Sequence, residues 1–146
     1  MAQKSLRARA IDALSRREYS RSELAGKLFP HAQNREALEA LLDALERENL
    51  LSDARFAESL THRREDRFGT RRVLLELERH GLSADLLARQ RSVLEATELE
   101  RCRAAWEKKF GTLPADFEER ARQTRFLEAR GFDHESIRRV LSGRLD

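Results

Sequence analysis

LERHGL, at residues 77–82, returns fifty residues later as LEARGF, at residues 127–132. In both copies a Leu begins a short charged stretch, and a Gly near its end is followed by an apolar residue. A Gly at such a point is typical of the left-handed residue that ends an α-helix. The pair therefore predicts the same helix end and the same turn at two places in the chain.

A third, weaker copy lies upstream at an offset of 49 residues, with Ala32 where the later copies have Gly81 and Gly131. Apolar residues fall into register at both offsets; the aligned sets are Leu28, Leu77 and Leu127, then Ile11, Leu60 and Phe110, and the pair Phe56 and Trp106. A helical repeat of this length cannot bury its apolar stripe alone, so neighbouring units stack in a row. We therefore expect an extended surface suited to holding another macromolecule.

Apolar residues recur at steps of three and four along the chain, and no segment alternates as a strand would. The expected fold class is all-α: three tandem three-helix repeats in an elongated, curved array. The units are expected at 1–51, 52–96 and 97–146. The expected helices are, roughly, 4–18, 20–29, 34–49, 53–66, 70–80, 84–95, 97–110, 115–130 and 134–143.

Several helix starts can be read from the sequence. Capping boxes are predicted at 20–23 and 97–100, where a Ser or Thr is followed three residues later by Glu. Asp53, Ser83 and Asp133 are predicted N-caps, since each stands just before an apolar helical pattern.

The composition predicts a thin core. Of 146 residues, 40% are hydrophobic and 38% are charged, and no apolar run is long enough to span a membrane. The N-terminal residues show no secretion signal. The single cysteine, Cys102, cannot form an internal disulfide. We therefore expect a cytoplasmic protein.

The net charge of +3 invites a nucleic-acid interpretation. The charge is spread evenly, however, because each of the three expected units carries one more basic than acidic residue. The chain therefore has no basic tail, and its charge alone does not favour DNA or RNA over a protein partner.

Three stretches together resemble the RecX family of regulatory proteins. Residues 49–57, NLLSDARFA, resemble that family's GYLDDxRFA signature, and residues 69–82 resemble its GxxRIxxELxxKGI motif. Residues 125–132, followed by Ile137 and Leu141, are similar to its third-repeat motif. The resemblance covers essentially the whole chain, in order. Among the departures, Asn49 replaces a Gly, and Asn also tolerates the left-handed conformation.

The resemblance implies a fold of three tandem three-helix units in a curved array. It implies a non-enzymatic protein that binds the RecA recombinase filament on single-stranded DNA and restrains its assembly, ATPase, strand exchange and co-protease activity. Some members of the family also bind DNA, single- or double-stranded. The resemblance implies no cofactor, no small-molecule substrate and no membrane partner.

One cluster of cations is a candidate binding surface for RecA or DNA. Five arginines lie within ten residues around Phe68 and Gly69, and Arg forks suit carboxylates and phosphates. A structural alternative is that these charges only complement the end of a helix. The candidate partner-binding residues are Arg63, Arg64, Arg67, Arg71, Arg72, Arg138 and Arg139.

Other chemistry is not indicated. The four histidines are isolated from one another and from Cys102, so the sequence predicts no metal site. The neighbours Arg101 and Arg103 could lower the pKa of Cys102, but no His partner is visible and no catalytic residue is predicted. The rival functions are a stand-alone DNA- or RNA-binding helical module and a general helical adaptor. The sign of an effect on RecA, and the choice between end capping and groove coating, stay open.

Overall fold

The computed structural model describes residues 3–143, and within them it contains nine α-helices and one short 3-10 helix. No helix of this range is long and apolar enough to cross a bilayer. The helices are α1 (Leu6–Leu14), α2 (Arg21–Leu28), η1 (Phe29–His31), α3 (Arg35–Arg47), α4 (Asp53–Arg64), α5 (Thr70–Glu78), α6 (Ala84–Ala96), α7 (Glu98–Lys109), α8 (Phe117–Ala129) and α9 (His134–Ser142).

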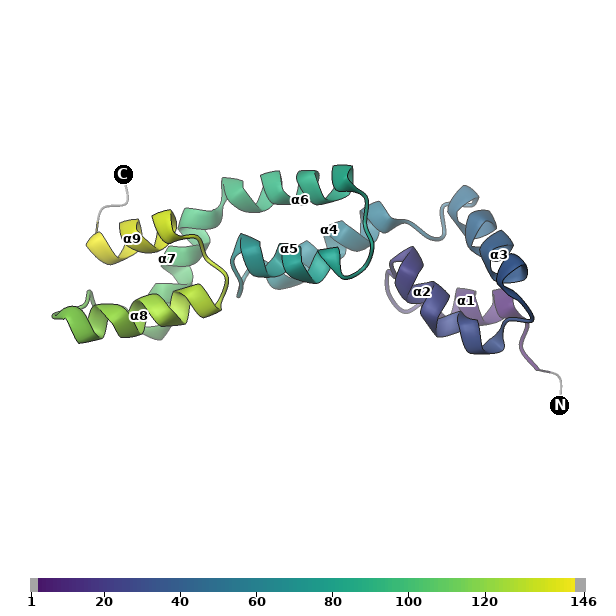
Figure 1. Ribbon diagram of the computed structural model, residues 1–146, viewed down its shortest axis with the longest axis horizontal. Helices are drawn as coiled ribbons and strands as arrows, with labels where there is room; N and C mark the ends of the chain where they lie inside the picture. Colours follow the sequence, from purple (N-terminus) through teal and green to yellow (C-terminus); the bar gives the residue numbers. More distant parts are fainter. Residues whose placement is uncertain (1–2, 144–146) are drawn as a thin grey trace.

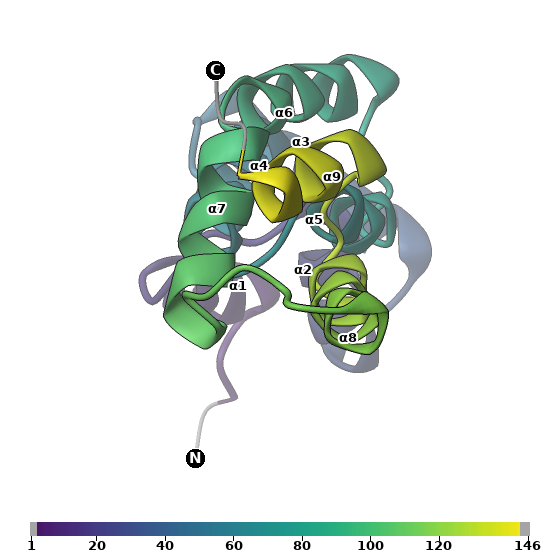
Figure 2. The same ribbon diagram turned by 90° about the vertical axis from the view of Figure 1, so that its left-hand side faces the viewer.

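The helices form an elongated array (Figure 1). Helices α1–α3 lie at one end, α4–α6 in the middle and α7–α9 at the other end. Figure 2 looks along the array, and there α7, α8 and α9 lie at the corners of a triangle. The predicted all-α class and the three successive three-helix groups are confirmed.

Each group of helices has a hydrophobic core of its own. The three cores fall within residues 10–51, 56–94 and 102–141. The middle one, for example, packs Phe56, Leu60 and Leu77. The unit boundaries expected at 51/52 and 96/97 stay a prediction, since separate cores do not establish separate domains.

The repeat in the sequence is a repeat of buried positions. Leu28, Leu77 and Leu127 are each at most 1% exposed, so the same leucine fills the same place in all three cores. The register predicted for Ile11 is wrong, because Ile11 is 37% exposed while the aligned Leu60 is buried. Helix α1 ends at Leu14, well before the expected end, and its buried residues are Ala10 and Ala13.

The later Gly residues end their helices as predicted. Gly81 and Gly131 have φ of 67° and 92°, in the left-handed region, and Asn49 has φ of 61°. Ala32, at the matching position of the first unit, is not left-handed, because the 3-10 helix η1 follows α2 and leads into extended backbone there.

Most predicted N-caps are confirmed, and two are corrected. Ser20, Ser83 and Asp133 accept hydrogen bonds from amides three residues on. Asp53 is wrong as the cap of α4: Ser52 caps that helix, and the Asp53 carboxylate binds an amide of α2 instead. The predicted box at 97–100 is also wrong, since the Thr97 side chain caps nothing and accepts instead from Arg101.

The carboxylate of Asp53 closes the junction between the first and second units. It accepts a hydrogen bond of 2.7 Å from the amide of Arg21, the first residue of α2. Glu98 has the same place and the same role one unit later. It is the first residue of α7 and accepts 3.0 Å from the amide of Thr70, the first residue of α5. Each joining helix thus supplies a cap to the second helix of the unit before it.

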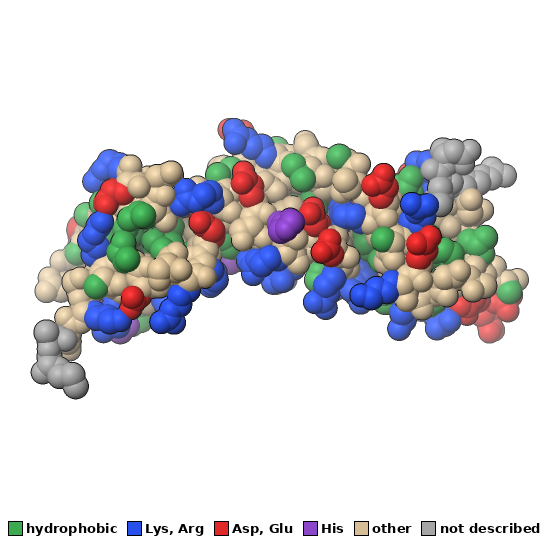
Figure 3. Space-filling model, turned by 180° about the vertical axis from the view of Figure 1, so that it is seen from behind, with side chains coloured by type: hydrophobic (Ala, Val, Ile, Leu, Met, Phe, Trp, Pro, Cys, Tyr) green, Lys and Arg blue, Asp and Glu red, His purple; other side chains and the backbone are tan. Residues whose placement is uncertain are grey.

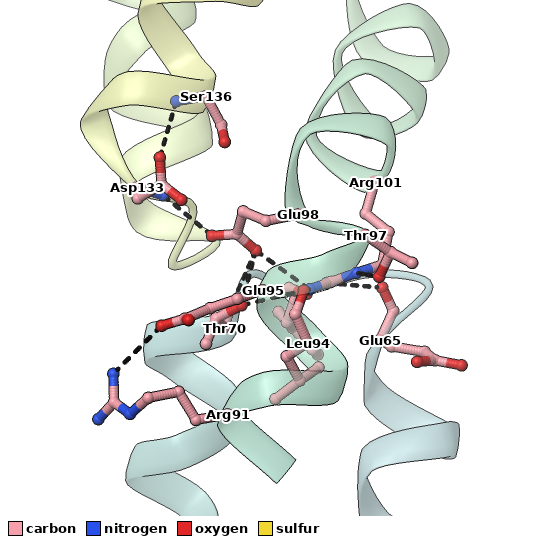
Figure 4. A network of polar contacts seen from close by, with 11 residues as sticks. Glu65, Thr70, Arg91, Leu94, Glu95, Thr97, Glu98, Arg101, Asp133 and Ser136 are labelled. Atoms are coloured by element: carbon pink, nitrogen blue, oxygen red, sulfur yellow. Dashed lines mark hydrogen bonds and ion pairs between the residues drawn. The ribbon is translucent and has the colours of Figure 1, made fainter. Parts of the chain in front are cut away.

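Glu98 holds more than this one amide (Figure 4). Its Oε1 also accepts from the Thr70 hydroxyl at 2.9 Å and the Arg101 guanidinium at 3.0 Å. Its Oε2 accepts from the amide of Asp133 at 3.1 Å. Burial raises the pKa of Glu98, and these donors oppose that rise because they stabilise the carboxylate. One buried side chain therefore joins α5, α7 and the start of α9.

Backbone contact reinforces the second junction. The amide of Gly69 donates to the carbonyl of Arg130 at 2.7 Å, and the amide of Arg71 donates to that of Gly131 at 3.3 Å. A Cβ on Gly69 would lie 2.4 Å from the carbonyl group of Gly131. The two turns touch so closely that only glycine fits at this point.

We predict that Gly69→Ala destabilises the protein by about 2 kcal/mol, because the added methyl group would collide with backbone rather than with a flexible side chain. The φ of Gly69 is −79°, which Ala adopts freely, so the loss would be steric alone. Gly26→Ala is the matched control. That glycine lies inside α2 with open space around it, and the change should stabilise by about 0.5 kcal/mol. Urea unfolding measures both, and equal effects would contradict the close contact.

We also predict that Glu98→Gln lowers the free energy of unfolding by about 3 kcal/mol, because it leaves the Arg101 charge buried without its partner. Side-chain exposure is 11% for Arg101 and 4% for Glu98. Glu135→Gln breaks the exposed pair with Arg138 and should change stability by less than about 0.5 kcal/mol. Thermal and urea unfolding measure both variants. A similarly small loss of stability for both would show that Glu98 does not stabilise the junction between α5, α7 and α9.

Candidate partner-binding surface

A groove with a volume of about 570 Å³ lies where the second unit meets the third. It is formed by the end of α4, the turn that follows, the outer face of α5 and the end of α8. We call it the cationic groove. Its lining residues are Arg64, Arg67, Phe68, Arg71, Arg72, Leu75, Glu76, Arg79, Ala129 and Gly131.

Local helix geometry explains why so many cations meet here. Arg72 lies on α5, and Arg79 is the helical-conformation residue that caps its C-terminus seven residues later, so two helical turns place them on one face. Arg67 lies in the turn between α4 and α5 and lines the same groove. The groove therefore contains five arginines and one glutamate.

Only Arg64 of these five has a carboxylate partner within residues 3–143. Its Nε and Nη2 donate to the two carboxylate oxygens of Glu76 at 2.9 and 3.0 Å. The hydrogen bonds from Arg64 lower the pKa of Glu76 below its ordinary value and raise the pKa of Arg64. Although Arg79 follows Glu76 by only three residues, it is the guanidinium of Arg64, on the neighbouring helix, that pairs with Glu76.

Two of the predicted arginines also join the units. Arg71 donates to the carbonyl of Glu128 at 2.8 Å, and Arg72 donates to that of Ala129 at 3.2 Å. These carbonyls lie at the C-terminal end of α8, where the helix itself supplies no amide donor to them. A neutral acceptor leaves the positive charge uncompensated, so both arginines keep their attraction for an anion.

The ring of Phe68 holds three guanidinium groups in place. The Cζ atoms of Arg72, Arg67 and Arg130 lie 4.1, 5.4 and 5.5 Å from its centroid. Each such contact contributes about 0.5–1 kcal/mol at an exposed site. The side chains are therefore partly ordered before any ligand arrives, which reduces the entropy lost on binding.

The remaining candidates lie elsewhere. Arg63 is exposed but does not line the groove, and Arg138 on α9 pairs with Glu135 one turn away. Arg139 is half-buried on α9 and is likewise outside the groove. Of the seven candidate arginines, Arg64, Arg67, Arg71 and Arg72 line the groove, and partner binding by any of the seven stays a prediction.

Sequence reasoning missed Arg79 and Arg130. Arg79 could have been found from its seven-residue spacing to Arg72. Arg130 aligns with His80 in the repeat, and the two play similar parts. His80 Nδ1 lies 3.1 Å from the Ser20 hydroxyl of the first unit, and Arg130 donates to the carbonyl of Arg67 in the second.

The cationic groove lies on the long lower edge of the array. Helices α5 and α8 run along this edge in Figure 1. Seen from behind, the same edge has a concave outline, and Lys and Arg side chains gather along it (Figure 3). An anionic partner that followed this edge would meet cations over most of its length.

Cys102 is unsuited to chemistry. It is completely buried, and burial together with the Glu98 carboxylate raises the pKa of its thiol to about 12. The expectation that neighbouring arginines could lower this pKa is wrong, because desolvation outweighs them. Within residues 3–143 no three His, Cys, Asp or Glu side chains group as metal ligands would.

Comparison with known proteins gives consistent matches. A family model described as the third three-helix domain of RecX matches residues 96–141. The regulatory protein RecX of Ralstonia nicotianae is 52% identical over 139 residues, which cover 95% of this chain and 87% of that protein. The regulatory protein RecX of Chromobacterium violaceum is 45% identical over 143 residues, covering 98% and 93%.

Solved structures share the fold. A crystal structure of RecX from Lactobacillus salivarius superposes with a TM-score of 0.81 at 18% identity, over 94% of this chain and 93% of that one. A second crystal structure, of a regulatory protein RecX, gives a TM-score of 0.78 over 94% and 73%. At this level of identity the likeness concerns the fold alone.

We predict that the Arg64–Glu76 pair makes the free energy of unfolding depend on pH in the acidic range. The pKa of Glu76 is lower in the folded than in the unfolded state, so the pair stabilises the protein above pH 4.5 and loses this effect as the pH falls through the folded pKa. Because both side chains are about one-third exposed, the contribution is roughly 0.5 kcal/mol.

Glu76→Gln should therefore lower stability at pH 7 and reduce the loss between pH 5 and pH 3. Urea unfolding across this range measures the difference. Glu58→Gln is the control, since Glu58 is exposed and forms no ion pair within residues 3–143. The idea fails if the two variants show the same change with pH.

Proposed function

The chain belongs to the RecX family of regulatory proteins, and from this premise we propose that it regulates the RecA recombinase by docking in the groove of the filament that RecA forms on single-stranded DNA. Docking would restrain filament assembly, ATP hydrolysis, strand exchange and co-protease activity in recombination, repair and the SOS response. The protein itself would catalyse no reaction, and we expect it in the cytoplasm with RecA.

The observation that carries this proposal is the cationic groove on an elongated array. Arg67, Arg71, Arg72 and Arg79 have no carboxylate partner within residues 3–143, and such unpaired charge favours binding an anion. The array is a poor enclosure for a small substrate, but its long edge can follow an extended partner.

The proposed mechanism of regulation depends on the length of the array. If one unit binds a first RecA protomer, the other units reach a neighbouring protomer at high effective concentration. A bridge between two protomers fits only some filament geometries. It would therefore shift the filament between active and inactive states by its differential affinity for them.

A titration of RecA's DNA-dependent ATPase tests the proposal. The wild-type protein should change the rate at concentrations where it barely binds free oligonucleotides. We expect the double variant Arg67→Ala, Arg79→Ala to need about tenfold more protein for the same effect. Neither guanidinium donates a hydrogen bond within residues 3–143, so the fold should survive.

Two further variants complete this experiment. Arg103→Ala with Arg120→Ala removes two exposed charges outside the groove and should act like the wild type. Arg71→Ala with Arg72→Ala should weaken regulation too, but it also removes bonds to α8, so its unfolding must be measured alongside. Equal activity of the groove variants and the control would contradict the proposed surface.

The rival function is a stand-alone DNA- or RNA-binding module, since the cationic groove also suits phosphates. That protein would bind oligonucleotides tightly, with affinity falling steeply with salt, and would leave the ATPase of RecA unchanged. Such a result would replace the proposed function with the rival.

A further inference from the structure

Helix α5 separates the cationic groove from a second groove of opposite character. The second groove has a volume of about 470 Å³ and shares Arg71, Leu75 and Gly131 with the first. We call it the acidic groove. Its other lining residues are Thr70, Leu74, Glu78, Arg91, Glu95, Glu98, Glu128, Phe132, Asp133 and His134.

The carboxylates of this groove differ in availability. Glu98 and Asp133 are occupied by helix-end amides, and Glu95 lies 3.7 Å from Arg91. Glu78, at the end of α5, is exposed and forms no ion pair within residues 3–143. Within residues 3–143 the Glu128 carboxylate has one ion-pair partner, the imidazole of His134 at 4.0 Å. Glu78 and Glu128 therefore leave negative charge for a partner.

An apolar residue stands between the two charges. Leu75 is 50% exposed at the crest of α5, where both grooves meet, while Leu74 and Phe132 form an apolar floor on the acidic side. We call this strip of α5, with Leu75 at its crest, the α5 ridge. On this ridge the apolar side chain of Leu75 lies between the arginines of the cationic groove and the carboxylates of the acidic groove.

This arrangement distinguishes between classes of partner. A nucleic acid presents phosphates on every exposed side, so the acidic groove would repel it. A protein surface can offer acidic and basic side chains a few ångströms apart, with an apolar socket between them. If such a partner were turned round, its basic side chains would face the cationic groove and its acidic ones the acidic groove, and this repulsion disfavours the reversed orientation.

We propose that the α5 ridge docks on a protein surface of the RecA filament, with Leu75 in an apolar socket, a partner Lys or Arg in the acidic groove and partner carboxylates in the cationic groove. This inference rests on the proposed function and specifies its site. The paired grooves fix the direction in which the array lies on its partner.

Glu78→Arg tests the acidic side. The new residue ends α5, where a cation suits the helix dipole, so the fold is not endangered. Binding to RecA filaments should weaken about tenfold, and affinity for free oligonucleotides should stay equal or rise. Leu75→Ala should weaken filament binding without changing oligonucleotide affinity.

The matched control is Glu107→Arg, which makes the same charge change at an exposed residue of α7 outside both grooves and should bind like the wild type. Fluorescence anisotropy of protein labelled at its α-amino group measures both affinities, against filaments on poly(dT) with a non-hydrolysable ATP analogue and against poly(dT) alone. Sedimentation of each protein without RecA gives its oligomeric state.

The outcomes separate the two proposals. If the wild type does not bind filaments, the proposed function fails and this inference fails with it. If the wild type binds and Glu78→Arg binds equally well, only the inference is overturned. The inference is also overturned if Glu78→Arg tightens filament and oligonucleotide binding together, which would assign both grooves to DNA. A wild-type dimer that Glu78→Arg dissociates would instead assign the ridge to a second copy of this chain.

Discussion

The array depends on carboxylates that complete the helix ends of a neighbouring unit. Asp53 and Glu98 each begin the first helix of a unit, and each accepts the first amide of the second helix in the unit before. A helix start leaves four amides without partners, and a cap contributes about 1 kcal/mol. Because each core is small, these contacts decide how one unit is placed on the next. The curvature of the whole array follows from that placement.

The second junction also builds the cationic groove. The turn that carries Arg67 and the start of α5, which carries Arg71 and Arg72, fit against Gly131, and Arg71 and Arg72 donate to carbonyls of α8. A ligand that drew these side chains away would remove bonds between the second and third units. The same residues therefore serve the shape of the array and its charge, which explains why so many arginines gather at one turn.

The charge of the groove comes from pairing as much as from composition. The stretch 63–72 carries five arginines, yet Arg63 lies outside the groove and Arg64 is matched by Glu76. Arg79 lies in the groove, and Arg130 reaches Phe68 from the third unit. Across α5, the acidic groove draws on α5, α6, α7 and both sides of the turn after α8. Segments far apart in the chain thus give two neighbouring grooves opposite signs.

The sequence by itself determined the number and order of the helices, the repeat of the buried leucine at 28, 77 and 127, and the family. These follow from local periodicity and from residues such as Gly131, whose position after a helical pattern predicts a left-handed backbone conformation. Only the tertiary structure decided which arginines meet, that Glu76 pairs with Arg64, and that Asp53 and Glu98 cap helices of the preceding unit. The reason is physical. A helix pattern depends on neighbours three or four residues away, whereas the partner of a side chain can come from any segment that folding brings near it.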